Sequence, residues 1–554
     1  MIKTIPIMGT SGLRLTQENF NKPLFLEQFL AGVIAYFATL RDTTGNTTVV
    51  IGGDPRLGNA NRVQTALRML LAQDFKVVTA QDNVMTTPAI SGLILDTPQA
   101  LGGIIFTASH NPYTDVGIKI NDALGRGLLE SETAKIHVLQ NKPQPFTAYQ
   151  GPLEDGEKSG ILVRVNAAKV YGDFLDRWFD FKSMRKKLAQ RPAFKVMIDG
   201  MGGAAGPFVR DIFLSRLGFE EHRNITLINC APDPYLGGHD AQGFPKHPEP
   251  DFAYLPELIA ANATGNWDLV AGYDSDGDRR LDGGSGFWAE SADEFAALLT
   301  HATLLGLPAF FEKTSLMYIA RSAVTSATID LMEESIQKQL PAGLKLKIVQ
   351  TPTGFKYISP LGNLGVEESN GMGNPMHGEK DGIAATLMLL KVMVETGQSV
   401  KEILETYWQK FGRIYFTRGE ITNTTGTPEE KQKLATLFQT AHTKIGQTFG
   451  NLILEKVSNW VYIDPLTQQS EETNVTELHF SDGHLVKARF SGTGSGGYCL
   501  RVYASKEDKR YNRAKTLMTQ PMKDAFDALL TDSGFPRLSD HWTDTHQPDP
   551  YGQN

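Results

Sequence analysis

A serine on a short turn is the first residue in this chain that could do chemistry. Ser109 lies in the segment TASHNP (107–112), which follows an apolar run at residues 103–106. The run has the composition of a short buried strand, and Asn-Pro ends it as a turn. Strand ends of this kind present side chains to a cleft in α/β proteins. Taken alone, the segment favours a polar turn without chemistry, so its role depends on three other stretches.

Three carboxylates alternate along the second stretch, YDSDGDRR (273–280), which also follows an apolar strand. On an extended backbone Asp274, Asp276 and Asp278 would project to one side and converge. Anions this close repel each other unless a hard cation neutralises them, and Mg²⁺ prefers oxygen ligands while keeping positions open for phosphate or water. An EF-hand does not fit, because Arg279 stands where that loop needs glycine. The alternative is a solvated acidic turn.

A third stretch, RFSGTGSGG (489–497), has the composition of a phosphate cradle. Glycines expose backbone N–H groups, serine and threonine add hydroxyl donors, and Arg489 and Arg501 flank the segment. Arginines form forked, charge-assisted hydrogen bonds with phosphate. A glycine-rich hairpin without a ligand is the alternative.

Two polar loops form the fourth stretch, at residues 366–371 and 378–382. Their glutamates, serine and lysine alternate with glycines. Sugar hydroxyls require paired donors and acceptors of this kind. A solvated charged loop has the same composition, so both interpretations stay open.

The segment GMGGAA (200–205) matches a dinucleotide-binding fingerprint, because it follows a strand and precedes a helix. A tight strand–helix turn explains the same glycines. We therefore keep a nicotinamide-dependent oxidoreductase as a rival hypothesis.

Composition limits the classes of partner. The chain has 554 residues and a formal charge of -8, which argues against nucleic acid or an anionic membrane as a partner. Its 2 cysteines exclude a disulfide framework and fit a reducing cytoplasm. No signal peptide is evident, and the longest apolar region, residues 29–40, fits a buried helix better than a membrane span.

Strands alternate with helices over most of the chain, which predicts parallel-rich mixed sheets covered on both faces. After about residue 411 the runs become β-rich. We predict three related α/β domains at 1–190, 191–302 and 303–410, and a C-terminal α+β domain at 411–554. The last residues, from 539 onward, are predicted to be a loosely held tail.

Together these motifs resemble the α-D-phosphohexomutase superfamily, and most closely its phosphoglucomutase branch. The likeness spans nearly the whole chain in order. It includes GTSGLR (9–14), TASHNP (107–112), DSDGDR (274–279), TPTGF (351–355), EES (367–369), EKDG (379–382) and RFSGTGSGG (489–497). The resemblance implies four domains around a central cleft, with one loop from each.

The resemblance also implies a role for each site residue. Ser109 would carry a phosphoryl group, and Asp274, Asp276 and Asp278 would hold Mg²⁺ together with an oxygen on Ser109. His110, Lys119 and Arg14 would serve catalysis, with Lys119 or His110 as the general base. The residues implied to bind substrate are Arg14, Asp278, Arg279, Thr353, Gly354, Glu367, Ser369, Lys380, Arg489, Ser491, Gly492, Thr493 and Arg501.

The implied reaction is the interconversion of glucose 1-phosphate and glucose 6-phosphate through glucose 1,6-bisphosphate. The partners would be small sugar phosphates, and the protein a monomer, with a dimer as the alternative. Two positions depart from the pattern: Val366 and Ser275 stand where the sugar and metal loops usually have glycine. Mannose phosphate as a side substrate, a metal-dependent sugar phosphatase and a non-catalytic sugar-phosphate-binding protein stay open as alternatives.

Overall fold

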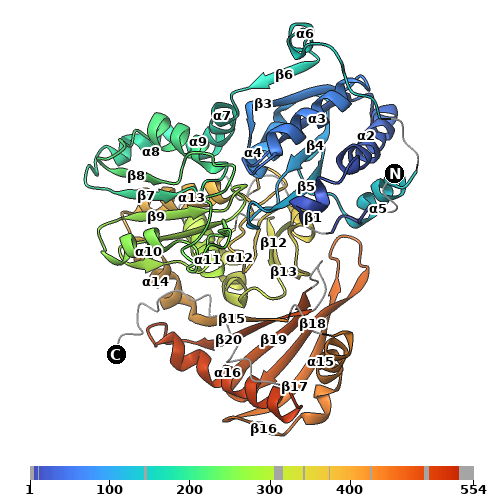
Figure 1. The fold of residues 1–554 in the computed structure, drawn as a ribbon. Helices are drawn as coiled ribbons and strands as arrows, with labels where there is room; N and C mark the ends of the chain where they lie inside the picture. The colour runs from blue at the N-terminus through green and yellow to red at the C-terminus, as the bar shows by residue number, and fades with distance from the viewer. Residues whose placement is uncertain are drawn as a thin grey trace.

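The chain folds into four sheets that follow one another along the sequence in a computed structural model (Figure 1). The structure describes residues 5–9, 12–142, 146–304, 316–340, 343–373, 375–423, 427–491 and 498–535. The predicted architecture of α/β units followed by an α+β unit is confirmed. Each sheet lies within one predicted domain, and the boundaries between the domains remain predictions.

The first sheet has the strand order β1-β5-β4-β2-β3-β6. Its central strands are parallel and fully buried, and β5 runs antiparallel to both β4 and β1. The elements are β1 (Leu13–Thr16), α1 (Gln17–Phe20), α2 (Phe25–Thr44), β2 (Thr48–Gly53), α3 (Asn59–Leu71), β3 (Lys76–Val84), α4 (Thr87–Asp96), β4 (Ala100–Phe106), β5 (Asp115–Asp122), α5 (Glu130–Gln140), α6 (Leu153–Ser159), β6 (Leu162–Val165), α7 (Ala167–Phe179) and α8 (Phe181–Leu188). The predicted apolar helix of residues 29–40 is the buried part of α2.

The second sheet has the order β11-β10-β9-β7-β8, with β9 and β8 parallel to β7. Strands β9 and β10 form an antiparallel pair, so the chain between them makes a turn at one edge of the sheet. The elements are β7 (Val196–Asp199), α9 (Ala205–Val209), the π-helix η1 (Arg210–Arg216), β8 (Ile225–Ile228), α10 (Pro256–Ala263), β9 (Leu269–Tyr273), β10 (Arg280–Gly284) and β11 (Phe287–Trp288).

The third sheet is small and parallel, in the order β13-β12-β14. Its elements are α11 (Ser291–Leu304), β12 (Leu316–Ser322), the 3-10 helix η3 (Ala327–Met332), α12 (Glu333–Gln339), β13 (Lys345–Thr351), η4 (Phe355–Tyr357), η5 (Ser359–Leu361), β14 (Gly365–Val366), α13 (Gly382–Thr396) and α14 (Val400–Phe411). One continuous apolar core joins the first three sheets: Ile90, Phe208, Leu298 and Leu387 all belong to it.

The fourth sheet is antiparallel throughout, in the order β15-β20-β19-β18-β17-β16. Its elements are β15 (Arg413–Asn423), α15 (Pro428–Thr440), η6 (Ala441–Lys444), β16 (Thr448–Phe449), β17 (Leu452–Ile463), β18 (Ser470–Phe480), η7 (Ser481–Gly483), β19 (His484–Ser491), β20 (Tyr498–Asp508) and α16 (Lys515–Asp532). It has an apolar core of its own, to which α15 and α16 contribute. This part forms the lower lobe, drawn in orange and red in Figure 1.

Among the described helices, none is by itself long and apolar enough to cross a membrane. Only α13 and α14 taken together reach the required length and composition, and they meet at an angle of 84°.

Candidate active site

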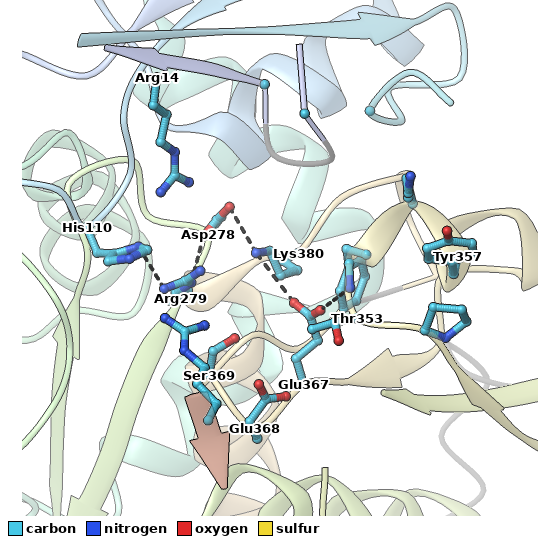
Figure 2. A pocket seen from close by; sticks show the side chains of 18 of the residues that line it. Arg14, His110, Asp278, Arg279, Thr353, Tyr357, Glu367, Glu368, Ser369 and Lys380 are labelled. Carbon is cyan, nitrogen blue, oxygen red and sulfur yellow. Dashed lines mark hydrogen bonds and ion pairs between the residues drawn. The ribbon is translucent and has the colours of Figure 1, made fainter. Parts of the chain in front are cut away.

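One large cleft lies where the four parts of the chain meet. Its volume is about 1180 Å³, and each part supplies lining residues, among them Arg14, Arg279, Glu367 and Arg489. Figure 2 shows Arg14, His110 and Asp278 on one side of Arg279, with Glu367 and Ser369 on the other. The cleft therefore brings together segments that are hundreds of residues apart in the sequence.

Ser109 lies at the carboxyl end of β4, as predicted, and is buried. Its backbone is left-handed, with φ of 52°, a conformation that residues other than glycine rarely adopt. The Ser109 N–H donates to Thr107 Oγ1 at 2.8 Å. Its hydroxyl donates to Asp274 Oδ2 at 3.0 Å. The turn thus holds the hydroxyl directly against the first acid of the β9–β10 segment.

The three acids converge on a turn and not on an extended strand, which corrects our prediction of the local backbone. Gly277 is left-handed there, with φ of 69°. A Cβ at that position would lie 2.9 Å from the Thr86 side chain, so a larger residue would disturb the contact with α4. Carboxylate oxygens of Asp274, Asp276 and Asp278 lie within 4.8 Å of one another, and all three residues are buried. The convergence that we predicted is present, but a tight turn produces it.

The chemistry of this donor set fits a divalent cation. The Oδ1 atoms of Asp276 and Asp278 are buried and have no hydrogen-bond partner within the described ranges. Unpaired buried carboxylate oxygens are costly unless a cation or a proton compensates them. Burial and the neighbouring Asp276 and Asp278 raise the pKa of Asp274 well above its ordinary value. Asp274 therefore holds a proton more readily than an ordinary aspartate, and a divalent cation at this site would compete with that proton.

Lys119, on β5, lies against these acids. Its Nζ is 2.8 Å from Asp276 Oδ2 and 3.1 Å from Asp278 Oδ2. Burial opposes the charged form, but the two carboxylates outweigh it and hold the pKa of Lys119 above its ordinary value. The same lysine helps to keep the pKa of Asp278 low, against the effect of burial. Lys119 is thus a cation that compensates the acid cluster in this state, and not a free base.

His110 has the opposite environment. Burial, Arg279 and Arg14 hold the pKa of His110 well below its ordinary value. Arg279 Nη1 donates to His110 Nδ1 at 2.8 Å, so this nitrogen is unprotonated. The same Nδ1 lies 3.4 Å from Ser109 Oγ. His110 is therefore a neutral imidazole at the hydroxyl of the serine.

Arg14 and Arg279 supply positive charge beside the serine turn. Arg14 Nη1 donates to Asn111 Oδ1 at 3.1 Å. The Nε atoms of both arginines are buried and have no hydrogen-bond partner among the described residues. Both residues line the cleft, and two guanidinium groups that keep an unsatisfied donor fit an anionic ligand.

The predicted sugar loops meet in the middle of the cleft. Glu367 Oε1 accepts from the Gly354 N–H at 3.0 Å, and Lys380 Nζ lies 3.7 Å from Glu367 Oε2. Lys380 also lies 3.4 Å from Asp278, which links this region to the acid cluster (Figure 2). Ser369 lines the cleft beside them. Acceptors and donors alternate here, as paired bonds to hydroxyls require.

The far end of the cleft carries arginines from the fourth sheet. Arg489 Nη1 donates to Thr353 Oγ1, and Arg501 Nε lies 2.8 Å from Glu420 Oε2. Both arginines line the cleft, as predicted. Gly492, Thr493 and the side chain of Ser491 lie outside the described residues, so the remaining phosphate-cradle residues stay predictions.

Sequence reasoning missed Arg418 on β15. It lines the cleft, and its Nη2 lies 2.7 Å from Asp251 Oδ2 on the opposite wall. Arg418 and Glu420 occupy alternate positions of one strand, so they share a face. That alternation within the predicted β-rich segment was the available signal.

The glycines of the dinucleotide-like segment have a structural role. A Cβ at Gly203 would lie 2.6 Å from Ser275 Cα, and one at Gly200 would lie 3.0 Å from the Asn229 carbonyl oxygen. The N–H of Ala204 donates to the Ser275 carbonyl at 2.8 Å. These glycines pack against protein and leave no space for a pyrophosphate, so the oxidoreductase hypothesis is wrong.

A buried serine beside three carboxylates, with arginines at both ends of one cleft, defines a phosphoryl-transfer site for a sugar phosphate. Family models agree with this class. Residues 6–144 match "Phosphoglucomutase/phosphomannomutase, alpha/beta/alpha domain I", residues 315–411 match domain III of the same family, and residues 413–537 match "Phosphoglucomutase-1, C-terminal domain".

Relatives extend the likeness along the whole chain. Bovine phosphoglucomutase-1 is 31% identical over 531 residues, covering 90% of each chain. Human phosphoglucomutase-1 is 30% identical over 548 residues, covering 93% of each. The structure of parafusin, a phosphoglucomutase from Paramecium in its open form, aligns with a TM-score of 0.78 at 27% identity, over 98% of this chain and 96% of that one. The chain belongs to the phosphoglucomutase family.

Proposed function

We propose that this protein is an isomerase that interconverts α-D-glucose 1-phosphate and glucose 6-phosphate, with a phosphorylated serine and a glucose 1,6-bisphosphate intermediate. One observation carries the proposal. The buried Ser109 hydroxyl lies 3.0 Å from Asp274 and 3.4 Å from Nδ1 of His110, and His110 lines a cleft that Arg489 and Arg501 also line. Two separate anion sites suit a sugar that carries its phosphate on carbon 1 or on carbon 6, and on both in the bisphosphate.

In this proposal phospho-Ser109 donates its phosphoryl group to the free hydroxyl of the bound sugar phosphate. The transition state is loose, and its charge spreads over the equatorial oxygens. Arg279 and Arg14 lie beside the serine turn to stabilise that charge. Mg²⁺ held by Asp274, Asp276 and Asp278 would supply further positive charge and orient the phosphoryl oxygens.

The sugar hydroxyl that accepts the phosphoryl group must lose a proton. Neutral His110 is the candidate to receive it: its Nδ1 faces Ser109 Oγ, and this nitrogen can take a proton once the phosphoryl group replaces it as the acceptor for Arg279 Nη1. Lys119 is held as a cation by Asp276 and Asp278. We therefore assign the proton to His110 and charge compensation to Lys119.

The middle and far parts of the cleft position the sugar. Glu367, Ser369, Lys380 and Thr353 with Gly354 would bind hydroxyls. Arg489, Arg501 and residues 491–493 would bind the phosphate that does not react. After the first transfer the bisphosphate turns over, and Ser109 takes up the other phosphoryl group. Because both ends of the sugar phosphate are bound, the reacting groups are already oriented toward each other. Such orientation supplies a large part of the rate gain in reactions of this kind.

A sugar phosphatase would need the serine and the acids but not the remote arginines. A coupled assay separates the two functions: glucose 1-phosphate is supplied with Mg²⁺, with and without glucose 1,6-bisphosphate, and glucose 6-phosphate and free phosphate are measured. We expect glucose 6-phosphate to form, the bisphosphate to stimulate it, and free phosphate to stay low. Free phosphate as the main product would overturn the proposal, and mannose 1-phosphate in the same assay measures the sugar preference.

Intact mass gives a second test, because a phosphoryl group on Ser109 adds about 80 Da. Ser109→Ala should lack this increment. A monomer in the cytoplasm remains our expectation for the assembly and location.

A further inference from the structure

Ser275 is the residue between the first two acids of the metal-site turn, where the family pattern usually has glycine. Its side chain is fully buried. Its Oγ lies 2.7 Å from the Ser109 carbonyl oxygen and 2.9 Å from Asp54 Oδ2. Arg56 Nη2 donates to the same Oγ at 3.0 Å. The hydroxyl has one proton to share between the two acceptors, and the three contacts together hold the oxygen between Asp54, Arg56 and Ser109.

The Ser109 turn depends on this contact. Ser109 has a left-handed backbone, which the surrounding groups must enforce. Its carbonyl accepts from Ser275 Oγ and from Arg56 Nη2, the latter also at 2.7 Å. Arg56 further binds the carbonyls of Asn111, Pro112 and Asp115 through Nη1. Arg56 and Ser275 thus hold the backbone of the Ser109 turn through its carbonyl groups.

Ser275 is also fixed on its own side. Its carbonyl accepts from the Ala204 N–H, and the Gly203 backbone packs directly against its Cα. Ser275 lies on the turn between β9 and β10 of the second sheet. Ser109, Asp54 and Arg56 lie on segments that follow strands β4 and β2 of the first sheet. Ser275 therefore joins the segment that carries the metal-site acids to the segment that carries the reacting hydroxyl.

We propose that Ser275 is a positioning residue that sets the place of Ser109 Oγ relative to Asp274, Asp276 and Asp278. This proposal rests on the proposed function and adds a residue to it. Ser275 touches neither the substrate nor the acids' oxygens. It acts through the backbone of Ser109, so its loss should lower the rate of phosphoryl transfer and weaken the metal site, while binding of the sugar phosphate stays the same.

The first test compares Ser275→Ala and Ser275→Gly with the wild type in the coupled assay. Both variants remove the hydroxyl, and the glycine variant restores the usual family residue, so at least one should fold. We expect kcat to fall roughly 10- to 100-fold, the range for residues that orient ligands from behind, with KM within about twofold. Ser326→Ala, which removes another buried serine hydroxyl away from the site, is the matched control. An unchanged kcat, an effect confined to KM, or an equal loss in Ser326→Ala would overturn the proposal.

The second test needs no turnover and so separates this proposal from the proposed function. Mg²⁺ binding to the unphosphorylated protein is measured by calorimetry for Ser275→Ala, Ser109→Ala and the double variant. Because Ser275 acts through Ser109, we expect each single change to weaken binding roughly tenfold, and the double variant to match Ser109→Ala. Additive losses, or no loss in Ser275→Ala, would show that Ser275 does not act through Ser109. If the wild type lacks mutase activity but this cycle holds, only the proposed function fails.

Discussion

The two ends of the cleft are built differently. At the serine end, side chains from the first two sheets hold the reacting groups: Arg56 and Ser275 fix the Ser109 carbonyl, and Thr87 Oγ1 donates to Asp276 at 2.8 Å. This end lies on the continuous core of the three α/β units. Contacts within the protein therefore hold the Ser109 turn and Asp276 in place.

At the far end, the arginines are occupied by acids of the protein. Arg501 pairs with Glu420 and Arg418 with Asp251, and a bound phosphate would compete with these carboxylates. The serine end thus holds the reacting groups in fixed positions, which favours the rate of phosphoryl transfer. The arginines of the far end can exchange a carboxylate partner for a phosphate, which favours reversible binding of the substrate. The following changes test that division, beginning with the largest expected effect.

Ser109→Ala should abolish mutase turnover, by at least about 10⁴-fold, because the Ser109 hydroxyl lies against both Asp274 and the cleft-lining His110, whereas the other hydroxyl on the acid cluster, that of Thr87, does not line the cleft. The coupled assay measures the loss, and the thermal unfolding midpoint checks that the fold is intact. Ser326→Ala serves as the control. If the variant kept its mutase turnover, Ser109 would not be the residue that carries the phosphoryl group.

Raising the pH should strengthen Mg²⁺ binding. Burial and the neighbouring acids raise the pKa of Asp274 in the metal-free protein, so a proton must leave when a cation enters. As pH rises toward that pKa, less free energy is spent on deprotonation and the affinity increases. Calorimetry at pH 6 and pH 8, in buffers with different heats of ionisation, measures both the affinity and the proton release. In Asp274→Asn this pH dependence should disappear, and an affinity that falls with pH would contradict the assignment.

Arg489→Ala should raise KM for glucose 1-phosphate about 10- to 100-fold, since a hydrogen bond to a charged group contributes about 1.5–3 kcal/mol. Phosphorylation of Ser109 at saturating glucose 1,6-bisphosphate, followed by intact mass, should change far less. Arg223→Ala, on an exposed arginine, is the control. Equal losses in KM and in phosphorylation would show that the two ends are not separable.

Glu420→Gln should give the smallest effect, a tightening of phosphate binding by about two- to fivefold. The carboxylate that pairs with Arg501 is partly exposed, and exposed pairs are weak. Inhibition by inorganic phosphate measures the change, and Glu334→Gln on α12 is the control. Weaker inhibition by phosphate would mean that Glu420 orients Arg501 and does not compete for it.

Sequence predicted the reacting residues better than their support. Ser109 and the three aspartates lie within short motifs whose spacing alone suggests chemistry. Arg56 has no such signal, because its partner Ser275 is 219 positions away and only the fold brings them together. The environment of Lys119 was not predictable for the same reason: the anions beside it belong to another sheet.

The fold class was predictable because alternating apolar runs and turn residues repeat along the chain. We predicted an extended backbone at Asp274–Asp278, but it is a turn. Acids at every second position of the sequence are compatible with an extended strand and with a turn, so their spacing does not distinguish the two. Only Gly277, with its left-handed backbone, distinguishes them, and its contact with Thr86 is visible only in the structure.

The separate core of the fourth sheet has a consequence for how substrate enters. Gly412, left-handed at φ of 91°, is the single residue between α14 and β15, and beyond it the chain contacts the rest through a small apolar cluster around Val324 and Tyr503, the stacking of Tyr511 on Trp408, and ion pairs such as Lys515 with Glu290. A rotation of the lobe that carries Arg489 and Arg501 about this joint would break those contacts but not the packing inside either core. Under the proposed function, such a rotation would let the bisphosphate reverse its ends while Ser109 stays aligned with the three aspartates.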